Sequence, residues 1–134
     1  MTNNSSSNYF DLHTNGIGYL NEVREVHPDG GNRFWSVKLA ALRGHVDNVE
    51  HTYFECVVVG EEAKDLVRQL KPAVEAGFKV LVGFHLSDLV GETFTFKSGE
   101  HTGQPGVSLK ARLLRLQWVK VNGQPFPAQR DVVA

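Results

Sequence analysis

Alternation of hydrophobic and polar residues predicts that most of this chain forms β-strands. In the clearest example, residues 33–43, every second side chain from Trp35 to Ala41 falls on one face, which is expected to point into the core. The same period of two predicts strands over residues 16–27, 33–43, 52–59, 78–86 and 107–121. In the last of these the alternation slips near Leu113 and Leu114, as is typical of a β-bulge.

One segment follows the period of a helix instead. Between residues 61 and 71 the apolar side chains recur at helical spacing, at Ala63, Leu66, Val67 and Leu70. Glu61 and Glu62 suit the positive end of the helix dipole, and Pro72 is expected to end or bend the helix. Residues 89–106, which are rich in glycine and aromatic residues, are predicted to form a loop.

The order of these elements is three strands, a helix and two strands. This is the order of a five-stranded Greek-key OB-fold barrel, an all-β fold with one helix between strands 3 and 4. Strands that bend around a barrel need glycines, and Gly18, Gly83 and Gly91 are candidates. We expect an OB-fold domain over residues 16–122, a flexible polar N-terminal arm over residues 1–15 and a short C-terminal tail without structure over residues 123–134.

Size and composition favour one globular domain. The chain has 134 residues, of which 41% are hydrophobic and 22% charged, which suits one packed core but not separate cofactor and substrate lobes. No apolar run approaches the roughly 20 residues that cross a bilayer, and the N-terminus lacks the pattern of a secretory signal. We therefore expect a cytoplasmic protein without membrane contact. The single cysteine, Cys56, is expected to be a small core residue.

Charge is uneven along the chain although it nearly cancels overall. The formal net charge is -1, which argues against the strongly basic surface of many duplex-DNA-binding proteins. Residues 1–91 carry 12 acidic and 8 basic side chains, whereas residues 92–122 carry 2 acidic and 5 basic ones. An anion-binding face is therefore expected to draw on the C-terminal third.

Few residues are arranged for catalysis or metal binding. The six histidines show no pair at the helical spacing that grips zinc, and no serine lies in a Gly-x-Ser-x-Gly turn. The glycine-rich stretches lack the spacing and the strand-to-helix context of a phosphate-binding loop. We expect no metal, no cofactor and no enzymatic activity. The alternative is a small enzyme that uses His85 and Asp88 as an acid–base couple.

Aromatic and cationic side chains on the outward strand faces form the main candidate site. Single-stranded nucleic acid binds where bases stack on exposed rings while lysine and arginine follow the phosphates. Strand parity turns residues of both kinds outward on neighbouring strands. The candidate nucleic-acid-binding residues are Phe34, Lys38, Tyr53, Phe94, Phe96, Lys97, Lys110 and Arg112. The alternative is that the phenylalanines lie in the core or in a subunit contact and that the lysines are only solvated.

Several adjoining stretches resemble a known family. YFECVVVG, EEAKDLVRQL and GFKVLVGFHL, over residues 53–86, resemble the third strand, helix and fourth strand of bacterial single-stranded-DNA-binding proteins, and GIGYLNEVREV and NRFWSVKLAALRG resemble their first two strands. The chain more closely resembles short members of this kind encoded on integrating conjugative elements, described as element replication proteins of unknown function. The resemblance implies a single-stranded DNA-binding protein with little sequence preference that acts in replication or transfer of a mobile element.

The resemblance also bears on individual residues. The position of Tyr53 often holds a base-stacking aromatic in that family, and the region of Phe94 and Phe96 often supplies another. Val59 replaces an aromatic of several relatives, so stacking is expected to be weaker or redistributed. The chain ends at QRDVVA and not at the acidic, phenylalanine-containing tip that recruits repair and replication enzymes, so recruitment through such a tip is not expected.

Two further expectations concern assembly. The family forms dimers or tetramers, and a small barrel with apolar residues facing outward would gain from a homo-oligomeric interface; such residues are Leu42, Val57 and Leu81. Net charge near zero favours an alternative function, an OB-fold protein–protein adaptor in a replication or conjugation complex that does not bind DNA directly.

Overall fold

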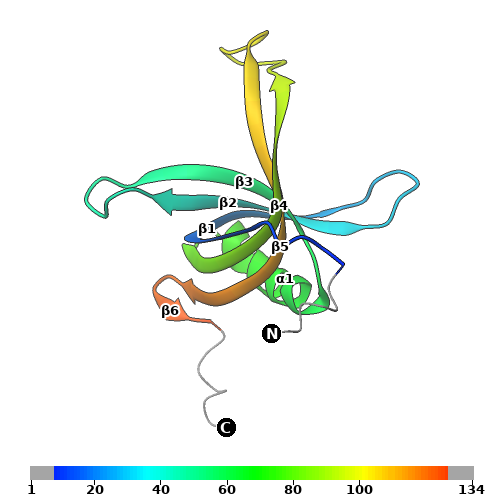
Figure 1. Cartoon of the computed structure of the whole chain (residues 1–134). Helices are drawn as coiled ribbons and strands as arrows, with labels where there is room; N and C mark the ends of the chain where they lie inside the picture. The colour runs from blue at the N-terminus through cyan, green and yellow to red at the C-terminus, as the bar shows by residue number, and fades with distance from the viewer. Residues whose placement is uncertain (1–7, 127–134) are drawn as a thin grey trace.

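The computed structural model describes residues 8–126 and forms one closed sheet with a single helix in this range (Figure 1). The elements are β1 (His13–Val26), β2 (Phe34–Arg43), β3 (Glu50–Val58), α1 (Glu61–Glu75), β4 (Val80–Thr95), β5 (Pro105–Val121) and β6 (Gln124–Pro125). The predicted order of three strands, helix and two strands is confirmed, with the addition of the short β6.

Strand pairing closes the first five strands into a barrel. β1 pairs antiparallel with both β2 and β4, β2 pairs with β3, and β4 pairs with β5. A parallel pairing of β3 with β5, from Phe54 opposite Leu109 to Val58 opposite Leu113, joins the two edges. This connectivity is that of a five-stranded Greek-key OB-fold barrel, so the predicted fold class is confirmed.

The predicted inward faces form the core. On β3 the alternation is complete, because Phe54, Cys56 and Val58 are buried while Tyr53 and Val57 are exposed. The same holds for the even-numbered residues of β4 from Val80 to Leu86, all of which are buried. Trp35 is half-buried and packs against this core from its edge. The helix α1 packs against β1, β4 and β5 through buried residues, which are Ala63, Val67 and Leu70.

Cys56 lies in this core, and burial changes its chemistry. Its side chain is 1% exposed. Burial, and to a smaller extent the neighbouring Glu55 carboxylate, raises the pKa of the Cys56 thiol to about 12. The stability that depends on the neutral thiol is therefore fully present below about pH 9 and is lost as the pH rises toward 12.

Cys56 is expected to resist alkylation in the folded protein, because the thiolate is the reactive form. At neutral pH iodoacetamide should leave the native chain unlabelled and should label the same chain in denaturant, as read by intact mass. Rapid labelling without denaturant would contradict the burial of this thiol.

The main correction concerns residues 89–106, which were predicted to form a loop. β4 continues to Thr95 and β5 begins at Pro105, and the two strands pair from Val90 opposite Lys110 to Thr95 opposite Pro105. Figure 1 shows this β4–β5 extension, here called the arm, standing out from the barrel on the side away from α1. Because each half of the arm supplies hydrogen-bond partners to the other, glycines and threonines that suggest a loop in isolation are held in strands.

Smaller differences lie at the ends of elements. β1 begins at His13, three residues before the expected start, because residues 13–15 pair with β4. Pro72 does not end α1, which continues to Glu75 because Ala73 and Val74 pack against the core. The tail was expected to lack structure, but Gln124 and Pro125 pair with β5 across a two-residue turn at Asn122 and Gly123, both with positive φ. Residues 1–7 of the expected N-terminal segment and residues 127–134 of the expected C-terminal tail lie outside the described range.

The predicted bulge in β5 is confirmed, and others accompany it. His85 faces Arg115 while Leu86 faces Leu113, so Leu114 is the extra residue. β4 has its own irregularity between Ser87 and Val90, where Asp88 has a φ of 56°. This bulge turns the strand between the barrel wall and the arm.

Candidate nucleic-acid interface

Most of the candidate residues lie on one face, which runs from the arm down the barrel. In the arm, the even-numbered residues of β4 and β5 have their side chains on this face, among them Glu92, Phe94, Ser108 and Lys110. At the foot of the arm they meet the outer side of β2 and β3 in a groove of about 340 Å3. Its lining residues are Lys38, Tyr53, Glu55, Phe94, Val107, Ser108 and Leu109.

A second hollow of about 280 Å3 continues the groove along β5. It shares Glu55, Phe94 and Ser108 with the first and adds Lys110 and Glu92. We call the two together the arm groove. The fold therefore brings four of the eight candidate residues together there: Lys38, Tyr53, Phe94 and Lys110.

Tyr53 supplies the most exposed aromatic ring of the arm groove. It lies on the outward parity of β3 and is 56% exposed, whereas the next residue, Phe54, is buried on the inward parity. His51, two residues earlier on the same parity, lies with its ring 6.2 Å from that of Tyr53 and tilted by 23°. The two nearly parallel rings place aromatic faces side by side on β3, of the kind on which bases stack.

The arm carries a second aromatic cluster. The rings of Phe94 and Phe96 lie 4.8 Å apart edge to face, and His101 lies 5.5 Å from Phe96. Both phenylalanines cover Gly106 on the opposite strand, where an added Cβ would lie 2.6 Å from Phe94 and 2.8 Å from Phe96. Glycine at 106 thus leaves room for both rings, and Phe94 remains 42% exposed.

The lysines of the groove alternate with carboxylates in a row across the strands. Glu22, Lys38, Glu55 and Lys110 occupy facing positions on β1, β2, β3 and β5. The Lys38 Nζ lies 3.9 Å from a Glu22 carboxylate oxygen, and the Lys110 Nζ lies 3.2 Å from one of Glu92. All four partners are at least two-fifths exposed, so each pair contributes little to stability. The row leaves the arm groove close to electrically neutral.

The other candidates lie apart from the groove. Arg112 is the next outward residue of β5 after Lys110 and lies 3.8 Å from Asp88. Phe96 and Lys97 lie at the far end of the arm. Phe34 begins β2, faces Val26 of β1 and is half-buried, roughly 13 Å along the strand from Lys38.

His85 and Asp88, the alternative acid–base couple, have different partners. His85 contacts Asn15 through Nδ1 and His13 through Nε2, the latter at 3.0 Å, whereas Asp88 lies beside Arg112. Over residues 8–126 no group of three or more histidine, cysteine, aspartate or glutamate side chains is placed to hold a metal ion. His85 and Asp88 are thus each paired with other side chains.

Some residues in the groove, and His51 beside Tyr53, were missed by reasoning from the sequence. His51 shares the parity of Tyr53, and this signal was sufficient to find it. Val107 could not be found in the same way, because its place in the groove depends on the pairing of β4 with β5 in the arm. The carboxylates of Glu55 and Glu92 were likewise missed, since only the register across strands places them beside the lysines.

Comparisons with known proteins identify a family and a similar solved structure. No curated protein matches the chain. Among solved structures, a small single-stranded DNA-binding protein from Streptomyces coelicolor is similar over 79% of this chain and 92% of its own, with 12% sequence identity and a TM-score of 0.49. Within the described residues no helix is long and apolar enough to cross a membrane. The sequence matches the family described as "Protein of unknown function (DUF3577)" over residues 3–133, nearly its whole length, and the chain belongs to that family.

Proposed function

We propose that the protein binds single-stranded DNA with little sequence preference, through the arm groove, and that it performs no catalytic step. The observation that carries the proposal is the convergence of Tyr53 and Phe94, both more than two-fifths exposed, with Lys38 and Lys110 in one groove. Exposed rings bind any base through its flat face, and the lysines reach the phosphates between bases. Such a site discriminates poorly between sequences, because stacking uses the flat face that all bases share and not the hydrogen-bonding edge that differs between them.

The alternating charges of the groove define how such binding would respond to salt. Each lysine of the groove is already paired with a carboxylate and must leave it to contact a phosphate. Binding of DNA therefore neutralises few phosphates in net terms and releases few counterions. The slope of the logarithm of affinity against that of salt is about -0.7 per neutralised phosphate on single strands. A shallow slope, of about one or two such contacts, is therefore expected, with stacking as the main source of affinity.

The proposal is tested by fluorescence anisotropy with labelled oligo-dT, duplex DNA and single-stranded RNA of equal length, each at two salt concentrations. Tight binding to oligo-dT with much weaker binding to duplex supports the proposal, because stacking needs unpaired bases. Absence of binding to all three at low salt would overturn it. The titration with RNA shows whether the groove tolerates the 2'-hydroxyl group.

Removing one carboxylate from the groove should strengthen binding. In the Glu92→Gln variant Lys110 loses its ion pair and becomes available to a phosphate, so affinity for oligo-dT should rise several-fold and the salt slope should steepen by about 0.7. Glu61→Gln on α1 is the matched control, since it makes the same change in net charge away from the groove. An equal gain in both variants would mean that only net charge acts, contrary to this prediction.

For the biological setting we propose a cytoplasmic role in replication or transfer of a mobile element, on the basis of the resemblance described above. We also propose a homo-oligomer, a dimer or a tetramer. The outer side of β1, β4 and β5 supports it, because Ile17 and Trp118 are 45% and 38% exposed and lie in one row across Gly83. Light scattering tests it, and a monomeric mass at working concentration would contradict it.

The second candidate function is the protein–protein adaptor. The charge balance of the groove favours it, because a groove whose charges cancel suits a protein surface as well as a DNA strand. Exposed Val90 and Val107 on the arm add apolar area of that kind. Failure to bind any oligonucleotide, together with co-purification of one defined protein through the intact arm, would select it.

A further inference from the structure

A further cleft lies along β5, beyond Lys110, the last cation of the arm groove. It has a volume of about 630 Å3, within the range of small-ligand sites, and separates the β4–β5 wall from the residues that precede β1. Buried Ser87 and half-buried Leu114 line its inner part. Arg112 and Asp88 lie on one side, and Tyr9 and Phe10 on the other.

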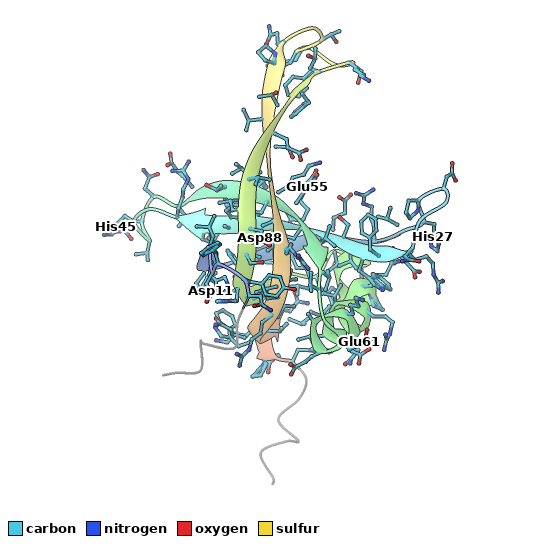
Figure 2. All side chains as sticks on the ribbon, turned by 45° about the vertical axis from the view of Figure 1, so that its right-hand side comes forward. Asp11, His27, His45, Glu55, Glu61 and Asp88 are labelled. Atoms are coloured by element: carbon cyan, nitrogen blue, oxygen red, sulfur yellow. The ribbon has the colours of Figure 1, made fainter. Side chains whose placement is uncertain are left out.

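Backbone contacts at Leu12 and His13 fix the end of the N-terminal segment, residues 8–12, beside this cleft. The amide of Asp88 donates a hydrogen bond of 3.0 Å to the carbonyl oxygen of Leu12, and the next residue, His13, pairs with Ser87. The left-handed backbone of Asp88 at the β4 bulge aims its amide in this direction. Figure 2 labels Asp11, in this segment, and Asp88 on the barrel wall, the two carboxylates that flank the cleft.

The aromatic rings of this segment are held at the cleft but are mostly uncovered. Tyr9 is 84% exposed and Phe10 is 98% exposed, although both line the cleft. Two successive aromatic residues on an anchored backbone offer flat apolar surfaces that gain by being covered with another flat group. A planar base is a group of that shape.

Arg112 supplies the complementary charge. Its Nη1 lies 3.8 Å from the Asp88 carboxylate, and both side chains are 53% exposed, so the pair is weak and the guanidinium can turn to a phosphate, which it binds through two N–H groups. The carboxylates of Asp11 and Asp88 disfavour the several negative charges of a free nucleotide. The single charge of a phosphodiester suits the cleft better, and this favours a nucleotide within a strand.

The cleft also neighbours the arm groove along β5. Lys110 and Arg112 are alternate residues on one face of β5, roughly 7 Å apart. A DNA strand that extends past Lys110 along β5 therefore reaches Arg112 next. We propose that the cleft is a second base-binding subsite, in which Tyr9 and Phe10 stack on bases of the strand held in the arm groove and Arg112 binds the phosphodiester that joins them. This inference rests on the proposed function. It extends the DNA-binding surface to residues 8–12, which lie in the segment that the sequence predicts to be flexible.

The subsite is tested by the dependence of affinity on strand length, using the whole chain. The variant Tyr9→Ala with Phe10→Ala removes both rings from an exposed segment, so it should fold as the wild type does. With short oligo-dT, which the arm groove alone accommodates, its affinity should equal that of the wild type. With long oligo-dT its affinity should fall about tenfold or more, and its affinity should stop rising with length earlier than that of the wild type.

Two further variants separate stacking from charge. Tyr9→Phe keeps a ring at position 9 and should bind as the wild type does at every length. Arg112→Gln should lose affinity only for the longer strands and should show a salt slope shallower by about 0.7. A strand that carries 5-iododeoxyuridine near one end should photo-crosslink to the peptide containing Tyr9 and Phe10, as located by mass spectrometry.

The results distinguish this inference from the proposed function beneath it. If the double variant follows the wild type at every length while both bind oligo-dT, the subsite is disproved and the arm groove stands. If the wild type binds no oligonucleotide of any length, the proposed function fails and the subsite with it. Crosslinks confined to β3 and the arm would also overturn the subsite.

Discussion

Replacing Tyr53 and Phe94 together by alanine is expected to lower the affinity for oligo-dT by about 30-fold or more. Stacking on an aromatic ring contributes about 1 to 3 kcal/mol per base, and these two rings line the same groove from β3 and from the arm. Both side chains are substantially exposed, at 56% and 42%, so their removal leaves the barrel core intact. Anisotropy titration measures the loss, and a denaturant titration verifies that the variant is folded.

Two controls give this result its meaning. Tyr53→Phe keeps the ring and should retain nearly all of the affinity, because the face of the ring and not the hydroxyl makes the contact. Phe78→Ala removes an aromatic that is 49% exposed but does not line the arm groove, and it should bind as the wild type does. Unchanged affinity in a folded Tyr53 and Phe94 double variant would remove both residues from the site and favour the adaptor function.

Gly18→Ala is expected to destabilise the barrel by about 1 to 3 kcal/mol or more. A Cβ at this position would lie 2.5 Å from the Ala40 carbonyl oxygen and 2.7 Å from the Ala41 Cα. Both are backbone atoms, so no side-chain rotation relieves the contact. β1 cannot shift away from β2 without disturbing the other side, because Gly18 also pairs with Val82 of β4. The midpoint of urea unfolding should therefore fall.

Gly91→Ala is the matched control for this substitution. Gly91 also lies in a strand, but an added Cβ would meet its nearest neighbours, Leu109 and Val107, at 3.8 Å, an ordinary contact distance. Replacing glycine by alanine in an unstrained strand position costs nothing and reduces the freedom of the unfolded chain. Equal unfolding midpoints for the two variants would show that the close approach at Gly18 is not what requires glycine there.

The uneven charge along the sequence has a specific structural outcome. The excess of basic residues after position 91 predicts an anion-binding face in the C-terminal third, and Lys110 and Arg112 do lie outward on β5. Each is nevertheless beside a carboxylate from β4, Glu92 for the lysine and Asp88 for the arginine. A count along the chain cannot detect this pairing, because it arises from the register of two strands that are joined through the arm.

The sequence by itself determined which residues face inward and the order of the elements. A period of two is a local property, so the burial of Leu39, Cys56 and Phe84 and the outward position of Tyr53 could be predicted from neighbours alone. The sequence also placed the bulge near Leu114, where that period breaks. The turn at Asn122 and Gly123 carries an equally local signal, an Asn-Gly pair between strand residues.

Only the tertiary structure decided what lies beside what. The arm exists because residues 90–95 and 105–110 pair with each other, and the turn residues between them conceal this from a local pattern. The continuation of α1 past Pro72 depends on the core contacts of Ala73 and Val74, which outweigh the cost of a proline inside a helix. The arm groove and the cleft at Arg112 join β2 to the arm and the N-terminal segment to β5. These neighbours are far apart in the chain, so their proximity follows from strand register and barrel closure and from no periodicity in the sequence.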